Sequence, residues 1–172
     1  ARRVWYFVVR FDTELLPDLP PGRMLEVGCA SGAFLNRMRQ RGWTVQGIEF
    51  SPSAAQAARD AGFDVQVSTV EAAQPPAQPC NLVVGWMVLE HLHDPHAALR
   101  KLAQWVTPDG WLAVSTPNAG SLEFRLFRDA GLLGYMGLSS PTVLAALRNL
   151  ERYSRVFSDA VEFQSDDLEE TG

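Results

Sequence analysis

The chain has 172 residues, with 15 Lys or Arg against 20 Asp or Glu and a formal net charge of -5, and this length allows one domain with a sizeable core. The acidic balance, with a single lysine and no basic patch, argues against a nucleic-acid partner. No apolar run is long enough to span a membrane and no signal peptide is recognisable, so we expect a cytoplasmic protein. The two cysteines, Cys29 and Cys80, lie in apolar runs and are expected to be reduced, buried thiols.

The first segment, residues 3–16, has apolar residues at helical spacing and predicts an amphipathic helix that lies against the domain. Packing onto the core is the favoured role of this helix, and covering a bound ligand is the alternative. The sequence Leu-Pro-Pro-Gly over 19–22 ends the helix and leads into the first strand of the core.

From residue 23 onward, short apolar runs alternate with capped helical segments, which is typical of an α/β fold. Helices are predicted over 32–41, from Pro52 to Ala61 behind an N-cap at Ser51, and from Pro95 behind an N-cap at Asp94. The expected strands are 24–27, 44–50, 65–70, 80–87 and 111–115, the last preceded by a turn over 107–110. Numbered in chain order, these strands predict a Rossmann-like doubly wound sheet, mostly parallel, with strand order 3-2-1-4-5.

The small residues over 28–32 predict a tight turn between the first strand and its helix. Such a turn places free backbone N–H groups at the carboxyl edge of the sheet, where open α/β folds bind ligands. Glu49 closes the second strand about 20 residues later, where a carboxylate can accept both ribose hydroxyls of an adenosine. A dinucleotide fingerprint fits loosely, since Gly28, Ala30 and Ala33 occupy its glycine positions. An ordinary turn without a ligand is the plain alternative.

The stretch Glu26-Val-Gly28-Cys-Ala30-Ser-Gly32 resembles the first motif of class I methyltransferases that depend on S-adenosylmethionine, with Ala30 in place of the middle glycine. Residues 85–95 and 107–118 resemble later motifs of the small-molecule members of that family, including the O-methyltransferases of ubiquinone biosynthesis. The resemblance implies the class I methyltransferase fold and an enzyme that moves a methyl group from S-adenosylmethionine to a small molecule, leaving S-adenosylhomocysteine. By the same analogy, the expected acceptor atom is a hydroxyl oxygen.

The resemblance also implies a cofactor site built from strand ends and the turns after them. Its expected members are Glu26, Gly28, Cys29, Ala30, Gly32, Phe34, Glu49, Phe50, Ser51, Val70, Glu71, Trp86 and Met87. His91, after the fourth strand, is the candidate general base, with a structural hydrogen-bonding role as the alternative. Some relatives place a Glu-x-x-Glu-His metal cluster here, but Met87 replaces its first glutamate, so we expect no metal.

The sequence also bears on three other functions. A methyltransferase-like binding or scaffold domain without turnover is compatible with the thinner resemblance after residue 128. A nicotinamide-dependent oxidoreductase is less favoured, because its common short-chain form needs Tyr-x-x-x-Lys and Ala97 stands four residues before Lys101. A methyltransferase acting on nucleic acid or on protein amino groups is disfavoured, because Gly85-Trp-Met-Val88 occupies the place of an Asn-Pro-Pro-Tyr-like run.

We expect a single domain over 1–172, with an N-terminal helix cover (1–20), a cofactor-binding core (23–118) and a substrate-side segment (119–172), as a monomer or homodimer. The apolar segment 127–139 is interrupted by three glycines and is predicted to be a lid over bound substrate, with a fixed loop as the alternative. The tail over 153–163 is expected to add one or two edge strands. Beyond these strands, the C-terminal edge of the sheet is expected to be incomplete.

Overall fold

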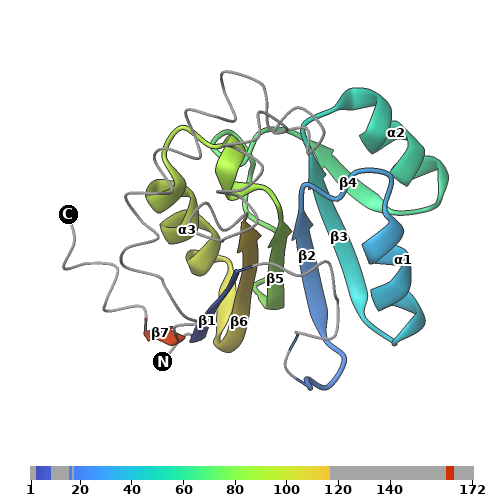
Figure 1. The fold of residues 1–172 in the computed structure, drawn as a ribbon. Coiled ribbons are helices and arrows are strands. Elements are labelled where there is room, and N and C mark those ends of the chain that lie inside the picture. Colours follow the sequence, from blue (N-terminus) through green and yellow to red (C-terminus); the bar gives the residue numbers. More distant parts are fainter. Residues whose placement is uncertain (1–2, 9–15, 17, 117–161, 165–172) are drawn as a thin grey trace, which may run out of the picture.

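The computed structural model describes residues 3–8, 16, 18–116 and 162–164. These residues form one seven-stranded sheet in the order β4-β3-β2-β5-β6-β1-β7 (Figure 1). The strands are β1 (Arg3–Val8), β2 (Arg23–Val27), β3 (Thr44–Glu49), β4 (Asp64–Val67), β5 (Cys80–Trp86), β6 (Val106–Thr116) and β7 (Glu162–Gln164). The helices are α1 (Ala33–Gln40), α2 (Pro52–Asp60), the short 3-10 helix η2 (Leu89–His91) and α3 (Pro95–Gln104).

The predicted strand order is confirmed. The five expected strands correspond to β2, β3, β4, β5 and β6, and their order β4-β3-β2-β5-β6 matches the expected 3-2-1-4-5. Every pairing among these five strands is parallel, so their carboxyl ends meet at one edge of the sheet (Figure 1). This edge is where an open α/β sheet offers a crevice for a ligand.

Local capping sets where two of the helices begin. The Ser51 hydroxyl accepts a hydrogen bond from the Ala54 N–H, and the Asp94 carboxylate accepts one from the Ala97 N–H at 2.8 Å. Each N-cap is followed by a proline in the first turn, which lacks an N–H that the helix would leave unpaired. Both predicted helix starts are therefore confirmed.

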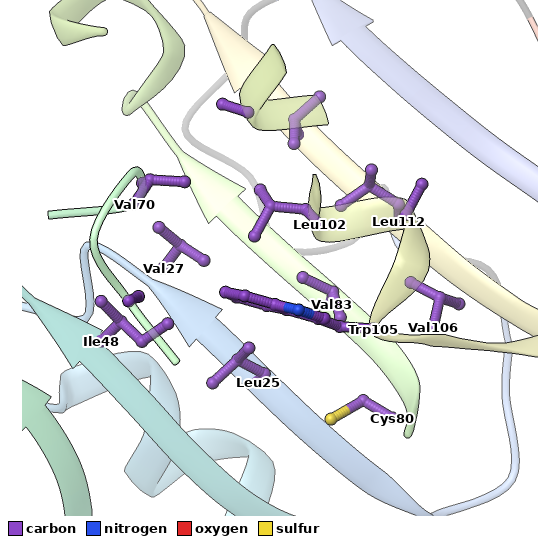
Figure 2. Packing of buried hydrophobic residues seen from close by; sticks show 14 of the residues in the cluster. Leu25, Val27, Ile48, Val70, Cys80, Val83, Leu102, Trp105, Val106 and Leu112 are labelled. Carbon is purple, nitrogen blue, oxygen red and sulfur yellow. The ribbon is translucent and has the colours of Figure 1, made fainter. Parts of the chain in front are cut away.

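The helices cover opposite faces of the sheet and divide the core into two layers. One layer packs α1 and α2 against the sheet and includes Met24, Leu35 and Ala58. The other packs α3 against the opposite face, where the Trp105 indole lies among side chains of β2, β5 and β6 (Figure 2). Because both faces are buried, the central strands read as nearly continuous apolar runs.

The prediction of an N-terminal helix is wrong over residues 3–8. This segment is β1, which pairs in parallel with β6 from Arg3↔Trp111 to Val8↔Thr116. The apolar residues of this segment are spaced closely enough to fit one face of a helix. However, five consecutive residues (4–8) are β-branched or aromatic, and such residues favour a strand. Residues 9–15 of the expected helix lie outside the described part of the chain.

Two further expectations are modified at the later strands. The turn predicted over 107–110 lies within β6, where the pairing with β5 shifts between Cys80↔Val106 and Leu82↔Trp111. β7 is the one described strand from the predicted C-terminal edge, and it runs antiparallel to β1. The predicted lid over 127–139 lies outside the described residues. No helix among the described residues has both the length and the apolar character that crossing a membrane requires.

Truncation of Leu102 tests the α3 layer of the core. This side chain is 1% exposed and packs in the layer around Trp105. We expect Leu102→Ala to lower the free energy of unfolding by about 2–5 kcal/mol, because the cavity removes both burial and packing contacts. Urea unfolding measures the change, with Arg100→Ala on the exposed side of the same helix as the control. A loss no larger than that of the control would contradict the assigned packing.

Candidate active site at the carboxyl edge of the sheet

The turn between β2 and α1 has a backbone that favours glycine at several positions. Gly28, Ala30 and Gly32 all have positive φ angles, of 72°, 47° and 85°. The Gly28 and Cys29 N–H groups donate to the Ile48 carbonyl at 2.8 and 3.2 Å, which fastens the turn to β3. A Cβ added at Gly28 would approach Val88 to 2.7 Å, so glycine is also required there for space.

Glu49 at the end of β3 joins two turns through its carboxylate. Its Oε2 accepts a hydrogen bond from the Ala30 N–H and its Oε1 accepts one from the Ser51 N–H, each at 2.8 Å. The side chain is half-buried. An ionised carboxylate offers about four acceptor positions, so each oxygen keeps one further lone pair for a hydroxyl donor.

Glu26 on β2 lies beneath the same turn and has a different environment. The side chain is 4% exposed, and its Oε2 has no hydrogen-bond partner among the described residues. Burial raises the pKa of Glu26 to about 8; the Leu35 backbone N–H opposes this rise and the nearby Glu49 charge adds to it. Glu26 is therefore mostly protonated at neutral pH, beside a half-buried carboxylate on the neighbouring strand.

An aromatic pair borders the site on the α1 side. Phe34 at the start of α1 meets Trp86 at the end of β5 edge-to-face, with ring centroids 5.4 Å apart. The Trp86 indole N–H is buried and has no partner among the described residues. Met87 follows with a φ of 55°, and its N–H donates to the Ser115 carbonyl at 3.0 Å and to the Ser115 hydroxyl at 3.2 Å.

The remaining expected cofactor residues divide into exposed and buried ones. Phe50 is 72% exposed and directly follows Glu49, so its ring is available to a flat ligand group. Val70 is 4% exposed and packs within the core, while Glu71 is exposed and its carbonyl accepts a hydrogen bond from Lys101 Nζ at 2.6 Å. Ser51 is the N-cap of α2 and offers its N–H to Glu49.

Both cysteines are buried thiols, as expected. Burial raises the pKa of Cys29 to about 12 and that of Cys80 to about 11, so neither is a nucleophile at neutral pH. A Cβ added at Gly47 would lie 2.5 Å from the Cys29 sulfur, so the thiol fills the space that this glycine leaves on β3. Cys29 therefore contributes its backbone to the turn, with its side chain in the core.

His91 ends η2 and its side chain is exposed, whereas the adjacent Glu90 is 2% exposed. Glu90 and His91 are the two residues of the Glu-x-x-Glu-His pattern that this chain retains. The Glu90 side chain is buried whereas the His91 side chain is exposed, so the two differ in their surroundings. Within the described ranges, no three His, Cys, Asp or Glu side chains gather closely enough to hold a metal ion.

A separate hollow of about 220 Å³ lies between β3, β4 and the segment 74–77. Its lining includes Gln46, Ile48, Gln66 and Pro75, and none of the predicted site residues. The hollow therefore shares β3 with the β2–α1 turn but includes none of the residues expected to bind the cofactor.

Three residues that shape the site are absent from the set expected from the sequence. Gly47 leaves space for the Cys29 thiol, and the Val88 side chain packs against Gly28. Ser115 accepts the Met87 N–H with both its carbonyl and its hydroxyl oxygen. Gly47 carried a detectable signal, because an isolated glycine inside a strand often marks a close approach. The other two depend on contacts between strands that are distant in sequence.

The residues present fit S-adenosylmethionine, which the resemblance implies. Val84 pairs with Glu26 across β2 and β5, so Trp86 lies two residues further along on the same face of the sheet. The Glu26 carboxyl oxygen and the Trp86 indole N–H, which have no hydrogen-bond partner in the described part of the chain, suit an ammonium and a carboxylate, the two groups of an amino acid. The free lone pairs of Glu49 suit a ribose diol.

The raised pKa of Glu26 predicts a particular dependence of stability on pH. Its pKa is about 8 in the folded protein against an ordinary 4.5. Between these values the folded state binds a proton that the unfolded state releases, so stability falls as pH rises. Relative to Glu26→Gln, which cannot ionise, the wild type should lose up to about 1.4 kcal/mol of unfolding free energy per pH unit. Urea unfolding at several pH values from 5 to 8 measures this, and parallel profiles for the two proteins would contradict it.

Comparison with known proteins identifies similar chains. Ubiquinone biosynthesis O-methyltransferase of Bordetella avium is 33% identical over 118 residues, covering 64% of this chain and 49% of the relative. The enzyme of the same name from Xanthomonas oryzae pv. oryzae is 32% identical over 152 residues, covering 78% of this chain and 64% of the relative. The chain thus spans about half the length of the first of these relatives.

Solved structures share the fold. An S-adenosylmethionine-dependent methyltransferase from Mesorhizobium loti superposes with a TM-score of 0.55 and 23% identity, over 60% of this chain and 50% of that one. A methyltransferase from Thermotoga maritima, described as a possible histamine N-methyltransferase, gives 0.56 and 24%, over 65% and 52%. The sequence model of a methyltransferase domain family matches residues 2–154. The chain therefore belongs to this methyltransferase domain family.

Proposed function

We propose that this protein binds S-adenosylmethionine at the β2–α1 turn and Glu49, and transfers its methyl group to a small molecule. The observation that carries the proposal is the Glu49 carboxylate, which is held by two backbone N–H groups and keeps one acceptor position on each oxygen. Two adjacent hydroxyls of a ribose match that pair of acceptors. Membership in a methyltransferase domain family supports the same assignment.

The chain's own residues are proposed to bind, orient and shield. Bound S-adenosylmethionine supplies an activated methyl group, so the protein needs alignment more than reactive side chains. Glu49 holds the ribose, Phe50 offers a ring to the adenine, and Glu26 and Trp86 face the amino-acid end. The aromatic pair of Phe34 and Trp86 limits water at the α1 side of the site.

The acceptor is proposed to be a hydroxyl oxygen of a small molecule. The curated relatives named above are O-methyltransferases, and a hydroxyl acceptor must lose a proton as the new bond forms. His91 follows β5, beside the residues proposed to face the cofactor, and its side chain is exposed. We assign it as the general base that takes this proton.

Glu49→Ala tests the cofactor assignment. We expect the affinity for S-adenosylmethionine to fall by about 1.5–3 kcal/mol, because hydrogen bonds to a charged group are lost. Isothermal titration calorimetry measures the change, with Asp109→Ala as a control that removes an exposed carboxylate at the other end of the sheet. Equal affinities for wild type and Glu49→Ala would refute the assignment.

His91→Ala tests the proposed base. We expect kcat for methylation of a phenol or catechol acceptor to fall about 100-fold or more, with unchanged affinity for S-adenosylmethionine. His93→Ala is the matched control, since that side chain is also exposed and lies two residues away. Unchanged kcat would remove His91 from the mechanism. Cofactor binding without methyl transfer to any acceptor in the wild type would instead favour a binding domain.

A further inference from the structure

We propose that Glu49 is also a positioning residue: its carboxylate holds the β2–α1 turn in its ligand-ready conformation before a cofactor arrives. The inference rests on the function proposed above only for the identity of the ligand. It concerns the bonds that the carboxylate makes within the protein itself, where its two oxygens accept the Ala30 and Ser51 N–H groups at 2.8 Å. The turn and the N-terminus of α2 are thereby joined through one side chain.

The backbone of Glu49 is held in place by hydrogen bonds to β4 and to the turn that follows it. Its backbone pairs with Val67 of β4, and its carbonyl accepts the Ser68 N–H at 3.0 Å. Ser51 is equally fixed, because its carbonyl accepts the Ala55 N–H in the first turn of α2. The Ser51 N–H therefore orients the Glu49 carboxylate, and the second oxygen is presented to the turn.

Ala30 needs such a partner more than the glycines around it. Its φ of 47° is a left-handed conformation, which is unfavourable for a residue with a Cβ. Ala30 is exposed and occupies the centre of the turn, between two glycines that adopt positive φ without that penalty. The bond to Glu49 is charge-assisted, and such bonds are stronger than those between neutral groups. It opposes relaxation of Ala30 to negative φ.

A change at Glu49 should consequently have two separable effects. Loss of the ribose hydrogen bonds weakens only ligands that carry ribose hydroxyls. Loss of the turn conformation weakens every ligand that contacts the turn, including one without those hydroxyls, and it alters the free protein as well.

The first experiment compares two ligands with two proteins. S-adenosylhomocysteine and its 2′,3′-dideoxy analogue are titrated by calorimetry into the wild type and into Glu49→Ala. We expect the variant to bind the dideoxy analogue about tenfold more weakly than the wild type does, the equivalent of one hydrogen bond to a charged group. Equal affinities for the analogue would overturn the proposal, because Glu49 would then act only through the ribose.

The second experiment needs no ligand. Amide hydrogen exchange in the free protein, followed by NMR, reports the Ala30 and Ser51 N–H groups directly. We expect both to exchange about tenfold faster in Glu49→Ala, while the Val83 amide in the core stays protected and shows that the fold is intact. Asp109→Ala is the charge-matched control and should leave both rates unchanged.

Glu49→Gln keeps the inference testable if Glu49→Ala does not fold. Glutamine has one carbonyl oxygen and an NH₂ group that cannot accept, so one of the two N–H partners must lose its bond. Faster exchange at Ala30 or Ser51 supports the inference, and unchanged exchange at both overturns it. If the wild type binds neither ligand, the proposed cofactor fails, while the exchange rates still decide whether Glu49 holds the turn.

Discussion

One carboxylate at the end of β3 receives N–H groups from two different turns, and the geometry of the candidate site depends on this convergence. It is possible because β2 and β3 are parallel and in register, with Val27 opposite Ile48. Their turns therefore leave the sheet side by side, and the Ile48 carbonyl can hold the Gly28 and Cys29 N–H groups. The pairing of β2 and β3 brings the two turns within reach of the Glu49 side chain, and its carboxylate bonds to both of them.

Two glutamates on neighbouring strands differ because of where the strands place them. Glu26 lies inside the layer beneath the turn, where desolvation favours its neutral form. Glu49 is half-buried at the strand end, where its two oxygens accept N–H groups from two different turns. The two carboxyl groups therefore offer a ligand different surroundings, a buried one beneath the turn and a hydrogen-bonded one at the strand end.

Local sequence signals predicted most of the central fold. The helix starts at Ser51 and Asp94 could be predicted because an N-cap bonds to a residue only a few positions away. The apolar runs and the glycine turn placed the parallel strands in the right order. The segment 3–8 was misassigned because its strand pairs with β6, more than a hundred residues away, and closely spaced apolar residues fit either a helix or a strand.

The site residues expected from the sequence remain a prediction, and the contacts among them depend on how the strands pair. Glu49 was expected to meet a ligand, but its bonds to Ala30 and Ser51 depend on the register of two strands. The positive φ of Met87 and its bonds to Ser115 likewise arise only when β5 and β6 are paired.

A crystal structure of the protein with S-adenosylhomocysteine would show whether Glu49 holds the ribose. We expect both ribose hydroxyls within hydrogen-bond distance of the Glu49 carboxylate, with the Ala30 N–H still bound to it and the amino-acid end beside Glu26 and Trp86. A ribose held elsewhere, with Glu49 bonded only to the backbone, would contradict this expectation.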